Sequence, residues 1–346
     1  MIRVLIVDDS TVIRQSTRFI LQSDPEIQVV GEASNGADAI AQVERLCPDV
    51  VTMDLTMPKM GGLDAIREIM AAHPVPIVVV TTLDLERELG IAAQATRLGA
   101  VSILNRPAGL ATQGCQQFAH KLIEQVKLMS AVRVIRQVRG SAHSSPLPPV
   151  APSRVELAQK TEIIAIGSST GGPAALHKIL SALPENLPVP VVIVQHISFG
   201  FVEGLASWLN DASRLQVKVG HAGAKIAPGH AFIAPDDRHM LIDQFGHITL
   251  SPAAPVSGHR PSVTPLFESV ARAFGRAAIG VILTGMGSDG ATGMKTLHDA
   301  GALTLAQDEA SCVVFGMPKE AITLGAVRRV EPLANIARIL QELVLA

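Results

Sequence analysis

The sequence predicts an α/β protein of two domains, each with a doubly wound parallel sheet, the second and larger one also carrying an antiparallel hairpin. Short runs rich in Val and Ile alternate with segments of helical periodicity along most of the 346 residues. One stretch, Arg139–Arg154, is rich in Pro and Ser and breaks this alternation. We therefore expect domains at residues 1–127 and 158–346, joined by a linker at residues 128–157.

The first domain is expected to hold five parallel strands with crossover helices. The expected strands are Val4–Val7, Val29–Glu32, Val50–Met53, Ile77–Thr81 and Val101–Leu104, and the expected helices are Thr11–Leu21, Ala37–Leu46, Leu63–Ala72, Glu86–Leu98 and Phe118–Met129. In such a sheet all strands end at one edge, and functional residues gather at that edge.

Three acidic residues fall at this edge. Asp8 and Asp9 follow the first strand, and Asp54 follows the third. Carboxylates that lie close together repel one another unless a cation joins them, and oxygen ligands of this kind suit Mg²⁺. Thr81, at the end of the fourth strand, offers a hydroxyl to the same place. Solvated loop acids or helix caps are the alternative interpretation, but an acidic pair together with a third acid favours a shared site.

Residues 1 to about 127 resemble a response-regulator receiver domain. The resemblance rests on LIVDDS at 5–10, on MDLTMPKMGGLD at 53–64, on Thr81, and on the Pro107 turn after Gly99-Ala100. Receivers carry a lysine just before this proline, whereas this chain has Arg106, which keeps the charge on a larger, forked group. The position of the aromatic switch residue is occupied by Ile103.

The receiver resemblance implies a phosphorylation site. Asp54 would accept a phosphoryl group from a histidine kinase. Asp8, Asp9 and Asp54 would hold Mg²⁺, with the backbone carbonyl of Thr56 as a further ligand. Thr81 would report phosphorylation by moving, and the Arg106 side chain would stand near the phosphoryl group.

The second domain is expected to be larger and mostly parallel. The expected strands are Ile163–Ile166, Val191–Gln195, Leu215–Val219, Ala231–Ala234, Met240–Ile242, Ile248–Leu250, Ala278–Leu283 and Leu303–Ala306, and the expected helices are Ala174–Leu183, Phe199–Leu209, Val263–Phe274, Ala291–Ala300 and two more towards the C-terminus. The four short, turn-bounded segments between residues 215 and 250 predict one strand plus antiparallel hairpin pieces.

A glycine-rich turn, GSSTGG at 167–172, links the first strand of this domain to its first helix. Its G-x-S-x-G spacing around Ser169 is that of a nucleophile elbow, which lifts a serine hydroxyl to the end of a sheet beside a helix N-terminus. The free N–H groups there suit an oxyanion. The same letters also approach a phosphate-binding loop, or form a plain tight turn, so three interpretations stay open at this point.

Ser169, His196 and Asp289 each follow a predicted strand of the second domain. A serine nucleophile needs a base, and the base needs an acid that fixes its tautomer. These three residues supply one of each, and Met286 offers a backbone N–H to an oxyanion.

Other residues compete for these roles. His259 is an alternative base, and Asp308 and Glu309 are alternative acids. Cys312 is an alternative nucleophile, although a lone cysteine beside apolar residues more often packs as a small hydrophobe.

The second half resembles the catalytic domain of the chemotaxis-type protein-glutamate methylesterases. The matching stretches are AIGSSTGGPAAL at 165–176, VIVQHISFGFVEGLASWLN at 192–210, GHAFIAPDDRHM at 229–240, RPSVTPLFESVA at 260–271, GVILTGMGSDGATGM at 280–294 and AQDEASCVVFGMPKEA at 306–321. This resemblance implies that Ser169, His196 and Asp289 form the catalytic triad, with Thr170 and Met286 lining the site and no cofactor for the esterase. His259 and Asp308 do not match the family's catalytic positions.

Together the two resemblances imply a phosphorylation-regulated hydrolase. It would demethylate glutamate methyl esters, and deamidate glutamines, on the cytoplasmic helices of chemoreceptors, with a chemotaxis histidine kinase as phosphodonor. The alternatives are a receiver joined to a dinucleotide-binding oxidoreductase, and a non-catalytic adaptor.

Composition restricts the partners and the compartment. A formal charge of −2 and the lack of a basic helix-turn-helix segment argue against nucleic-acid binding. Cys47, Cys115 and Cys312 are far apart and lack metal-binding spacing, which suits a reducing cytoplasm. The N-terminus does not have the pattern of a signal peptide, and no apolar run is long enough to predict a membrane span.

Overall fold

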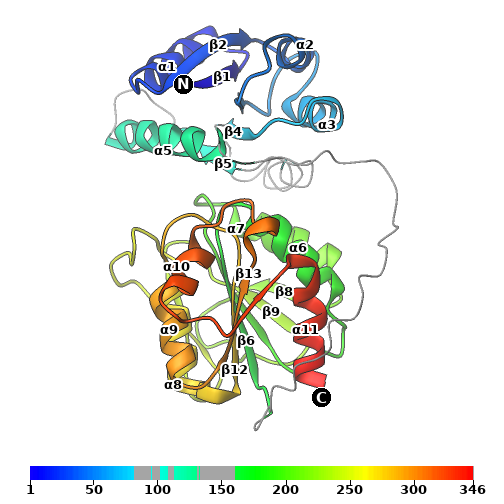
Figure 1. Ribbon diagram of the computed structural model, residues 1–346, viewed down its shortest axis with the longest axis vertical. Coiled ribbons are helices and arrows are strands. Elements are labelled where there is room, and N and C mark those ends of the chain that lie inside the picture. The colour runs from blue at the N-terminus through cyan, green and yellow to red at the C-terminus, as the bar shows by residue number, and fades with distance from the viewer. Residues whose placement is uncertain (82–94, 96–101, 108–112, 131, 133–159, 346) are drawn as a thin grey trace.

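The computed structural model describes residues 1–81, 95, 102–107, 113–130, 132 and 160–345 (Figure 1). The expected helix Glu86–Leu98, apart from residue 95, and the stretch Arg139–Arg154 lie outside the described residues, as does residue 101 of the expected fifth strand. Two α/β parts stand one above the other in Figure 1, and helix α5 of the upper part faces the lower one.

The N-terminal part is a three-layer sandwich around a five-stranded parallel sheet of order β2-β1-β3-β4-β5. Its elements are β1 (Ile2–Val7), α1 (Thr11–Gln22), β2 (Ile27–Ala33), α2 (Gly36–Leu46), β3 (Val50–Met53), α3 (Gly62–Ala72), β4 (Ile77–Thr81), β5 (Ser102–Asn105) and α5 (Gln113–Ser130). Helices α2 and α3 cover one face of the sheet, and α1 and α5 cover the other. The doubly wound arrangement predicted from the sequence is confirmed.

The C-terminal part is built on a seven-stranded sheet of order β14-β13-β12-β6-β7-β9-β8, whose paired strands all run parallel. Its elements are β6 (Ile163–Ser168), α6 (Gly172–Ala182), β7 (Val191–Gln195), α7 (Val202–Ala212), β8 (Gln216–Val219), β9 (His230–Ile233), β10 (His239–Ile242), β11 (Ile248–Ser251), α8 (Val263–Phe274), β12 (Ala278–Ile282), α9 (Ala291–Asp299), β13 (Leu303–Gln307), α10 (Met317–Thr323), β14 (Arg329–Glu331) and α11 (Leu333–Leu345). Helices α6, α7 and α11 pack on one face, and α8, α9 and α10 pack on the other.

Three details of this part differ from the prediction. Both β8 and β9 are parallel strands of the large sheet, with β9 between β7 and β8, so only β10 and β11 form an antiparallel pair. Strand β14 was not predicted, because its three residues are too few for a periodic signal. Helix α7 begins at Val202 rather than at Phe199, since Gly200 has a φ of +88°, which a right-handed helix does not accommodate.

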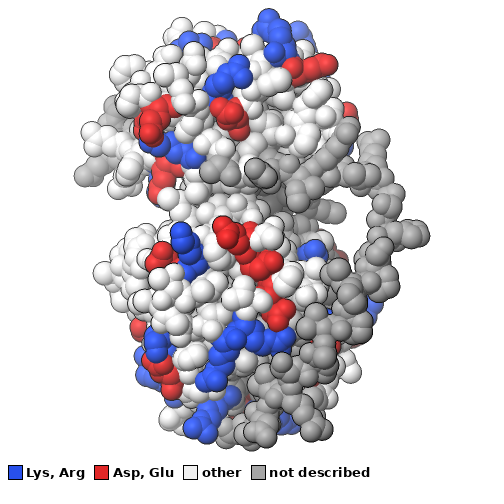
Figure 2. Space-filling view, viewed as in Figure 1, with Lys and Arg blue, Asp and Glu red and all other residues white. Residues whose placement is uncertain are grey.

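Two further features concern the whole described chain. No helix within the described ranges is both long enough and apolar enough to span a bilayer. Basic and acidic side chains are interspersed on the face shown in Figure 2.

The domain boundaries at residues 127 and 158 stay predictions; α5 continues past the first of them to Ser130.

Candidate active site

Ser169 lies in the turn between β6 and α6, at the carboxyl edge of the large sheet. The turn packs so closely against neighbouring segments that a side chain at either Gly171 or Gly172 would overlap their atoms. A Cβ at Gly171, where φ is +78°, would lie 2.5 Å from Val313, and one at Gly172 would lie 2.0 Å from the Gln195 side chain. The predicted strand–turn–helix context of a nucleophile elbow is therefore present, and its glycines are required for close packing.

The buried amide of Gln195 ties the ends of β6 and β7 together. Its Nε2 donates to the carbonyl oxygens of Ser169 and His196, both at 2.8 Å, and its Oε1 accepts from the Ser168 hydroxyl at 2.6 Å. These bonds fix the backbone at Ser169 relative to the backbone at His196. Gln195 was not predicted, because its only signal in the sequence is one polar residue at the end of an apolar run.

Asp289 is 1% exposed and accepts a hydrogen bond from His196, with Nε2 and Oδ2 2.8 Å apart. It also lies at the N-terminus of α8, which presents free N–H groups to a carboxylate. The remaining donors are the Ser262 hydroxyl at 2.6 Å, the Val263 N–H at 2.8 Å, the Thr264 hydroxyl at 2.8 Å, the Thr264 N–H at 3.2 Å and the Gly290 N–H at 2.9 Å. Burial acts to raise the pKa of Asp289, but the bonds from His196, Ser262 and Val263 outweigh it and hold that pKa well below its usual range.

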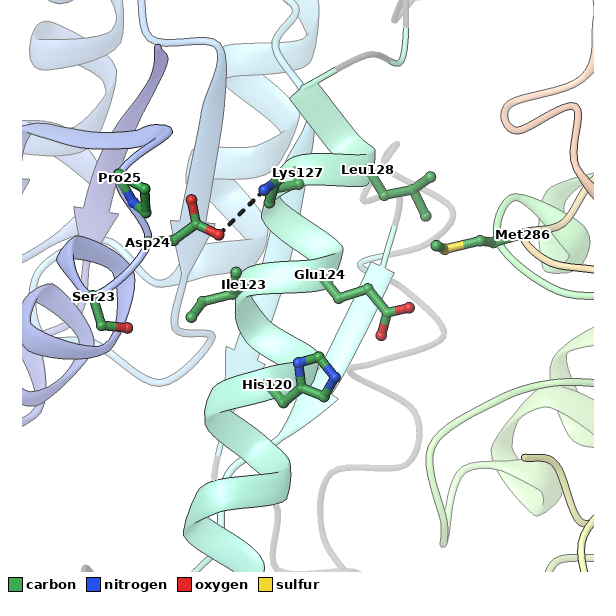
Figure 3. Close-up of a pocket in the computed structure, with 9 residues that line it drawn as sticks. All are labelled: Ser23, Asp24, Pro25, His120, Ile123, Glu124, Lys127, Leu128 and Met286. Atoms are coloured by element: carbon green, nitrogen blue, oxygen red, sulfur yellow. Dashed lines mark hydrogen bonds and ion pairs between the residues drawn. The ribbon is translucent and has the colours of Figure 1, made fainter. Parts of the chain in front are cut away.

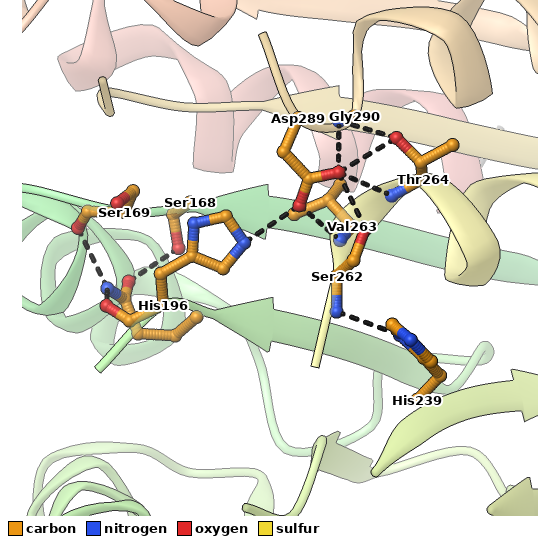
Figure 4. A network of polar contacts seen from close by, with 10 residues as sticks. Ser168, Ser169, His196, His239, Ser262, Val263, Thr264, Asp289 and Gly290 are labelled. Carbon is orange, nitrogen blue, oxygen red and sulfur yellow. Dashed lines mark hydrogen bonds and ion pairs between the residues drawn. The ribbon is translucent and has the colours of Figure 1, made fainter. Parts of the chain in front are cut away.

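The ionised Asp289 assigns the tautomer of His196. Because Asp289 only accepts hydrogen bonds, the His196 Nε2 carries a proton, and in the neutral imidazole the basic nitrogen is then Nδ1. This Nδ1 is buried and has no hydrogen-bond partner in the described chain. It lies on the side of the ring towards Ser169 (Figure 4). The geometry therefore offers a free basic nitrogen to a serine hydroxyl, and free enzymes often hold such pairs apart until substrate binds.

The buried His239 holds one of the donors of Asp289, Ser262, in position. His239 Nδ1 accepts from the Ser262 N–H at 3.2 Å, and its Nε2 lies 3.1 Å from the Ala254 carbonyl oxygen, to which it donates. Both ring nitrogens are thus satisfied with His239 neutral, and Ser262 is held where its hydroxyl reaches Asp289. Neither residue was predicted, because the contact of His239 with Ser262 spans 23 residues and that of Ser262 with Asp289 spans 27.

The loop after β12 closes against Ser169. A Cβ at Gly285 would lie 2.7 Å from the Ser169 Cβ, and the Ser169 N–H donates to the Thr284 carbonyl oxygen at 3.0 Å. The Thr284 hydroxyl donates to the carbonyl oxygen of Thr170 at 2.9 Å. Thr170 is therefore bonded to this loop, and Met286 is the residue after Gly285 in it. The roles of Thr170 and Met286 stay predictions.

The competing residues take other places. Asp308 caps a short 3₁₀ turn, where it accepts from the Ser311 N–H at 3.1 Å, and Glu309 is exposed in that turn. Burial, assisted by the charge of Asp308, raises the pKa of Cys312 to about 12, so its thiol stays protonated. His259 does not bond to Asp289 in the structure. Its ring instead stacks on that of His196.

The acidic residues of the N-terminal part do meet. Asp8, Asp9 and Asp54 each offer an oxygen atom, and these atoms all lie within 4.8 Å of one another. Burial, and then the charge of Asp8, raise the pKa of Asp54 to about 6. Such a set of oxygen donors fits a hard divalent cation. The Arg106 Nη1 lies 3.0 Å from Asp8 Oδ2, and the backbone N–H of Arg106 donates to the carbonyl oxygen of the buried Thr81 at 2.9 Å.

The N-terminal and C-terminal parts touch near the carboxyl edge of the large sheet, where His196 lies. The Ser198 hydroxyl, two residues after His196, donates to the Ile103 carbonyl oxygen at 2.9 Å. Val314 packs against the apolar cluster of the N-terminal part. A cavity of about 520 Å³ is lined by residues of α5, by residues 23–25 after α1, and by Met286 of the C-terminal part, whose side chain points towards α5 (Figure 3).

Comparison with known proteins explains this combination of parts. The family model for CheB methylesterase matches residues 164–340, and that for the response regulator receiver domain matches residues 4–132. The protein-glutamate methylesterase/protein-glutamine glutaminase 1 of Syntrophus aciditrophicus is 44% identical over 345 residues, which cover 99% of this chain and 98% of the relative. The chain belongs to the CheB methylesterase family.

Two further similar proteins support this assignment. Protein-glutamate methylesterase/protein-glutamine glutaminase 4 of Geobacter metallireducens is 45% identical over 345 residues, covering 99% of both chains. The crystal structure of the Thermotoga maritima CheB methylesterase catalytic domain is 40% identical, has a TM-score of 0.52, and covers 54% of this chain and 100% of that chain. Both resemblances drawn from the sequence are confirmed.

Proposed function

We propose that this CheB-family protein is a receiver-controlled serine hydrolase that removes methyl groups from glutamate methyl esters on the cytoplasmic helices of chemoreceptors. The observation that carries the proposal is the buried His196–Asp289 pair, which leaves an unprotonated nitrogen on the side of Ser169. The names of the relatives support both esterase and glutaminase chemistry. The reaction takes place in the cytoplasm, where these receptor helices lie.

In the proposed mechanism each of these residues has one role. His196 Nδ1 takes the proton of the Ser169 hydroxyl as its oxygen attacks the ester carbonyl, and Asp289 stabilises the imidazolium. Backbone N–H groups near Ser169 and Met286 hold the oxyanion. Collapse of the tetrahedral intermediate expels methanol, which leaves with the proton from His196. Water then hydrolyses the acyl-enzyme by the same route. Deamidation of glutamine follows the same path, with ammonia as the leaving group.

The receiver part supplies control through Asp54. Mg²⁺ would be held by Asp8, Asp9, Asp54 and the carbonyl of Thr56, where it would neutralise charge on an incoming phosphoryl group. A chemotaxis histidine kinase is the proposed donor. Arg106, which already contacts Asp8, would add a second positive charge.

Replacement of the phosphoacceptor tests this control. We expect Asp54→Asn to abolish the stimulation of methanol release by a small phosphodonor, because the amide cannot accept the phosphoryl group. EDTA should do the same to the wild type. Asp64→Asn is the matched control, since the Asp64 side chain is 60% exposed on α3. Stimulation that persists in Asp54→Asn would exclude Asp54 as the acceptor.

The same contacts suggest how the receiver restricts the esterase. We propose that the unphosphorylated receiver packs over the catalytic edge and that phosphorylation shifts the population towards an open form. The hydrogen bond from Ser198 to Ile103 and the packing of Val314 support this closed arrangement.

Ser198→Ala removes this hydrogen bond and should therefore favour the open form. If the bond stabilises the closed form by about 1 kcal/mol, its loss corresponds to a roughly fivefold rise in methanol release without phosphodonor, and to little change in release with phosphodonor. Ser213→Ala is the control, because its hydroxyl makes a similar bond, to Leu180 at 3.1 Å, within the C-terminal part. Deletion of residues 1–139 should raise the rate further. An unchanged rate in both Ser198→Ala and the deletion would refute the inhibitory role.

A further inference from the structure

We propose that His259 is a positioning residue for the esterase: its imidazole stacks on the ring of His196 and holds that ring in the plane in which Nδ1 faces Ser169. The two ring centroids lie 3.8 Å apart, and the ring planes differ by only 8°. This inference rests on the proposed function.

His196 needs such support because its ring is anchored by a single hydrogen bond. Asp289 fixes the position of Nε2, while Nδ1 has no partner in the described chain. One bond leaves the tilt of the ring to be set by packing. Because a reacting atom misplaced by about 1 Å can cost about 100-fold in rate, the surface that fixes this tilt matters for catalysis.

A tight turn presents His259 to its partner. Its N–H donates to the Val256 carbonyl oxygen and its carbonyl accepts from the Val256 N–H, both at 3.0 Å. The two residues between them, Ser257 and Gly258, have φ values of +52° and +79°. Successive positive φ values are typical of the two-residue turns that close hairpins, so the backbone of His259 is fixed on one side.

The next residue anchors the other side. Arg260 Nε donates to Asp237 Oδ1 at 2.9 Å, and its Nη1 lies 3.2 Å from the carbonyl oxygens of Pro252 and Ala253. His259 therefore stands between two fixed points and provides a rigid surface. A histidine that merely filled space would not need both anchors.

The charge state of His259 suits this role. Burial first, then the charge that His196 carries as an imidazolium and the charge of Lys121, lower the pKa of His259 to about 4, while Asp289 acts in the opposite direction. Beside a protonated His196, His259 is therefore neutral above about pH 4. When His196 becomes an imidazolium, it meets the face of a neutral ring rather than a second cation, so the stack does not oppose the proton transfer.

Two substitutions in the full chain separate the stack from other roles. His259→Leu removes the flat ring, and His259→Phe keeps it without a titratable group. We would measure kcat and KM for methanol release from methylated receptor membranes, and the rate at which a fluorophosphonate probe labels Ser169. We expect His259→Leu to lower kcat and the labelling rate by about tenfold with KM within about twofold, and His259→Phe to restore most of the loss.

The controls make each outcome decisive. His221→Leu changes an exposed histidine and should behave as the wild type. Wild-type rates in His259→Leu, or a Phe variant no better than the Leu variant, would overturn the proposal. So would a Leu defect that disappears when a phosphodonor is added, because the defect would then lie in domain packing near Lys121. If the wild-type chain itself shows no labelling that depends on Ser169, the proposed function fails with it.

Discussion

Ser169→Ala is expected to abolish methanol release while leaving the fold intact. Without the hydroxyl there is no nucleophile for His196 to activate, and removal of the nucleophile in hydrolases of this type lowers kcat by about 10⁵-fold or more. The hydrogen bonds around the turn use the backbone of Ser169 and the side chains of Gln195 and Thr284, which the substitution leaves in place. We therefore expect a thermal midpoint within about 2 °C of the wild type.

The matched control is Ser181→Ala, which removes an exposed hydroxyl from the helix that follows the same turn. It should retain wild-type activity. Circular dichroism melting and methanol release, measured on the same preparations, separate loss of chemistry from loss of structure. Substantial release by a folded Ser169→Ala variant would exclude the serine mechanism.

Asp289→Asn is expected to lower kcat by about 10⁴-fold, because a neutral amide no longer fixes the tautomer of His196 or stabilises its imidazolium. This variant should also unfold more easily, by about 1–3 kcal/mol. The amide keeps one of the two oxygens, so its NH₂ group would face either the Ser262 hydroxyl at the Oδ1 position or the Val263 N–H at the Oδ2 position, and the buried donors on that side would lose their acceptor.

The depressed pKa of Asp289 gives this loss a definite pH dependence. A carboxyl group whose pKa is lower in the folded chain contributes stability that is fully present above its unfolded pKa, about 3.9, and is lost as the pH falls through its folded pKa. The stability difference between wild type and Asp289→Asn should therefore be constant from about pH 5 to 8 and shrink in strong acid. Urea unfolding of both variants, from neutral pH into strong acid, measures this stability difference.

Asp308→Asn provides the comparison, since Asp308 was the alternative acid and caps a 3₁₀ turn instead. We expect its kcat to stay within about twofold of the wild type. If Asp308→Asn were the inactive variant and Asp289→Asn the active one, the assignment of the acid would be reversed.

The sequence could predict those residues that lie directly after strands. Ser169 and His196 follow β6 and β7 at once, so the strand pattern alone places both at one sheet edge. Asp289 stands seven residues after β12, and it was predicted because the glycine-rich loop that contains it follows that strand. Asp8, Asp9 and Asp54 were found in the same way at the edge of the smaller sheet, and they lie together as expected.

What the sequence could not predict are contacts made between loops distant along the chain. The stack of His259 on His196 joins residues 63 positions apart, and no periodicity links a turn residue to a ring it touches only after folding. The same holds for His239, which reaches Asp289 only through Ser262. The parallel pairing of β8 with β9 was missed because a loop, not a helix, connects them.

The most direct test of the account is the rate of methanol release from methylated receptor membranes by the full chain, with and without a small phosphodonor. We predict release by the wild type that the phosphodonor stimulates, no stimulation in Asp54→Asn, and no release in Ser169→Ala under either condition. This result would link the serine chemistry of the large sheet to the acidic site of the small one. Absence of release by the wild type with phosphodonor present would contradict the account.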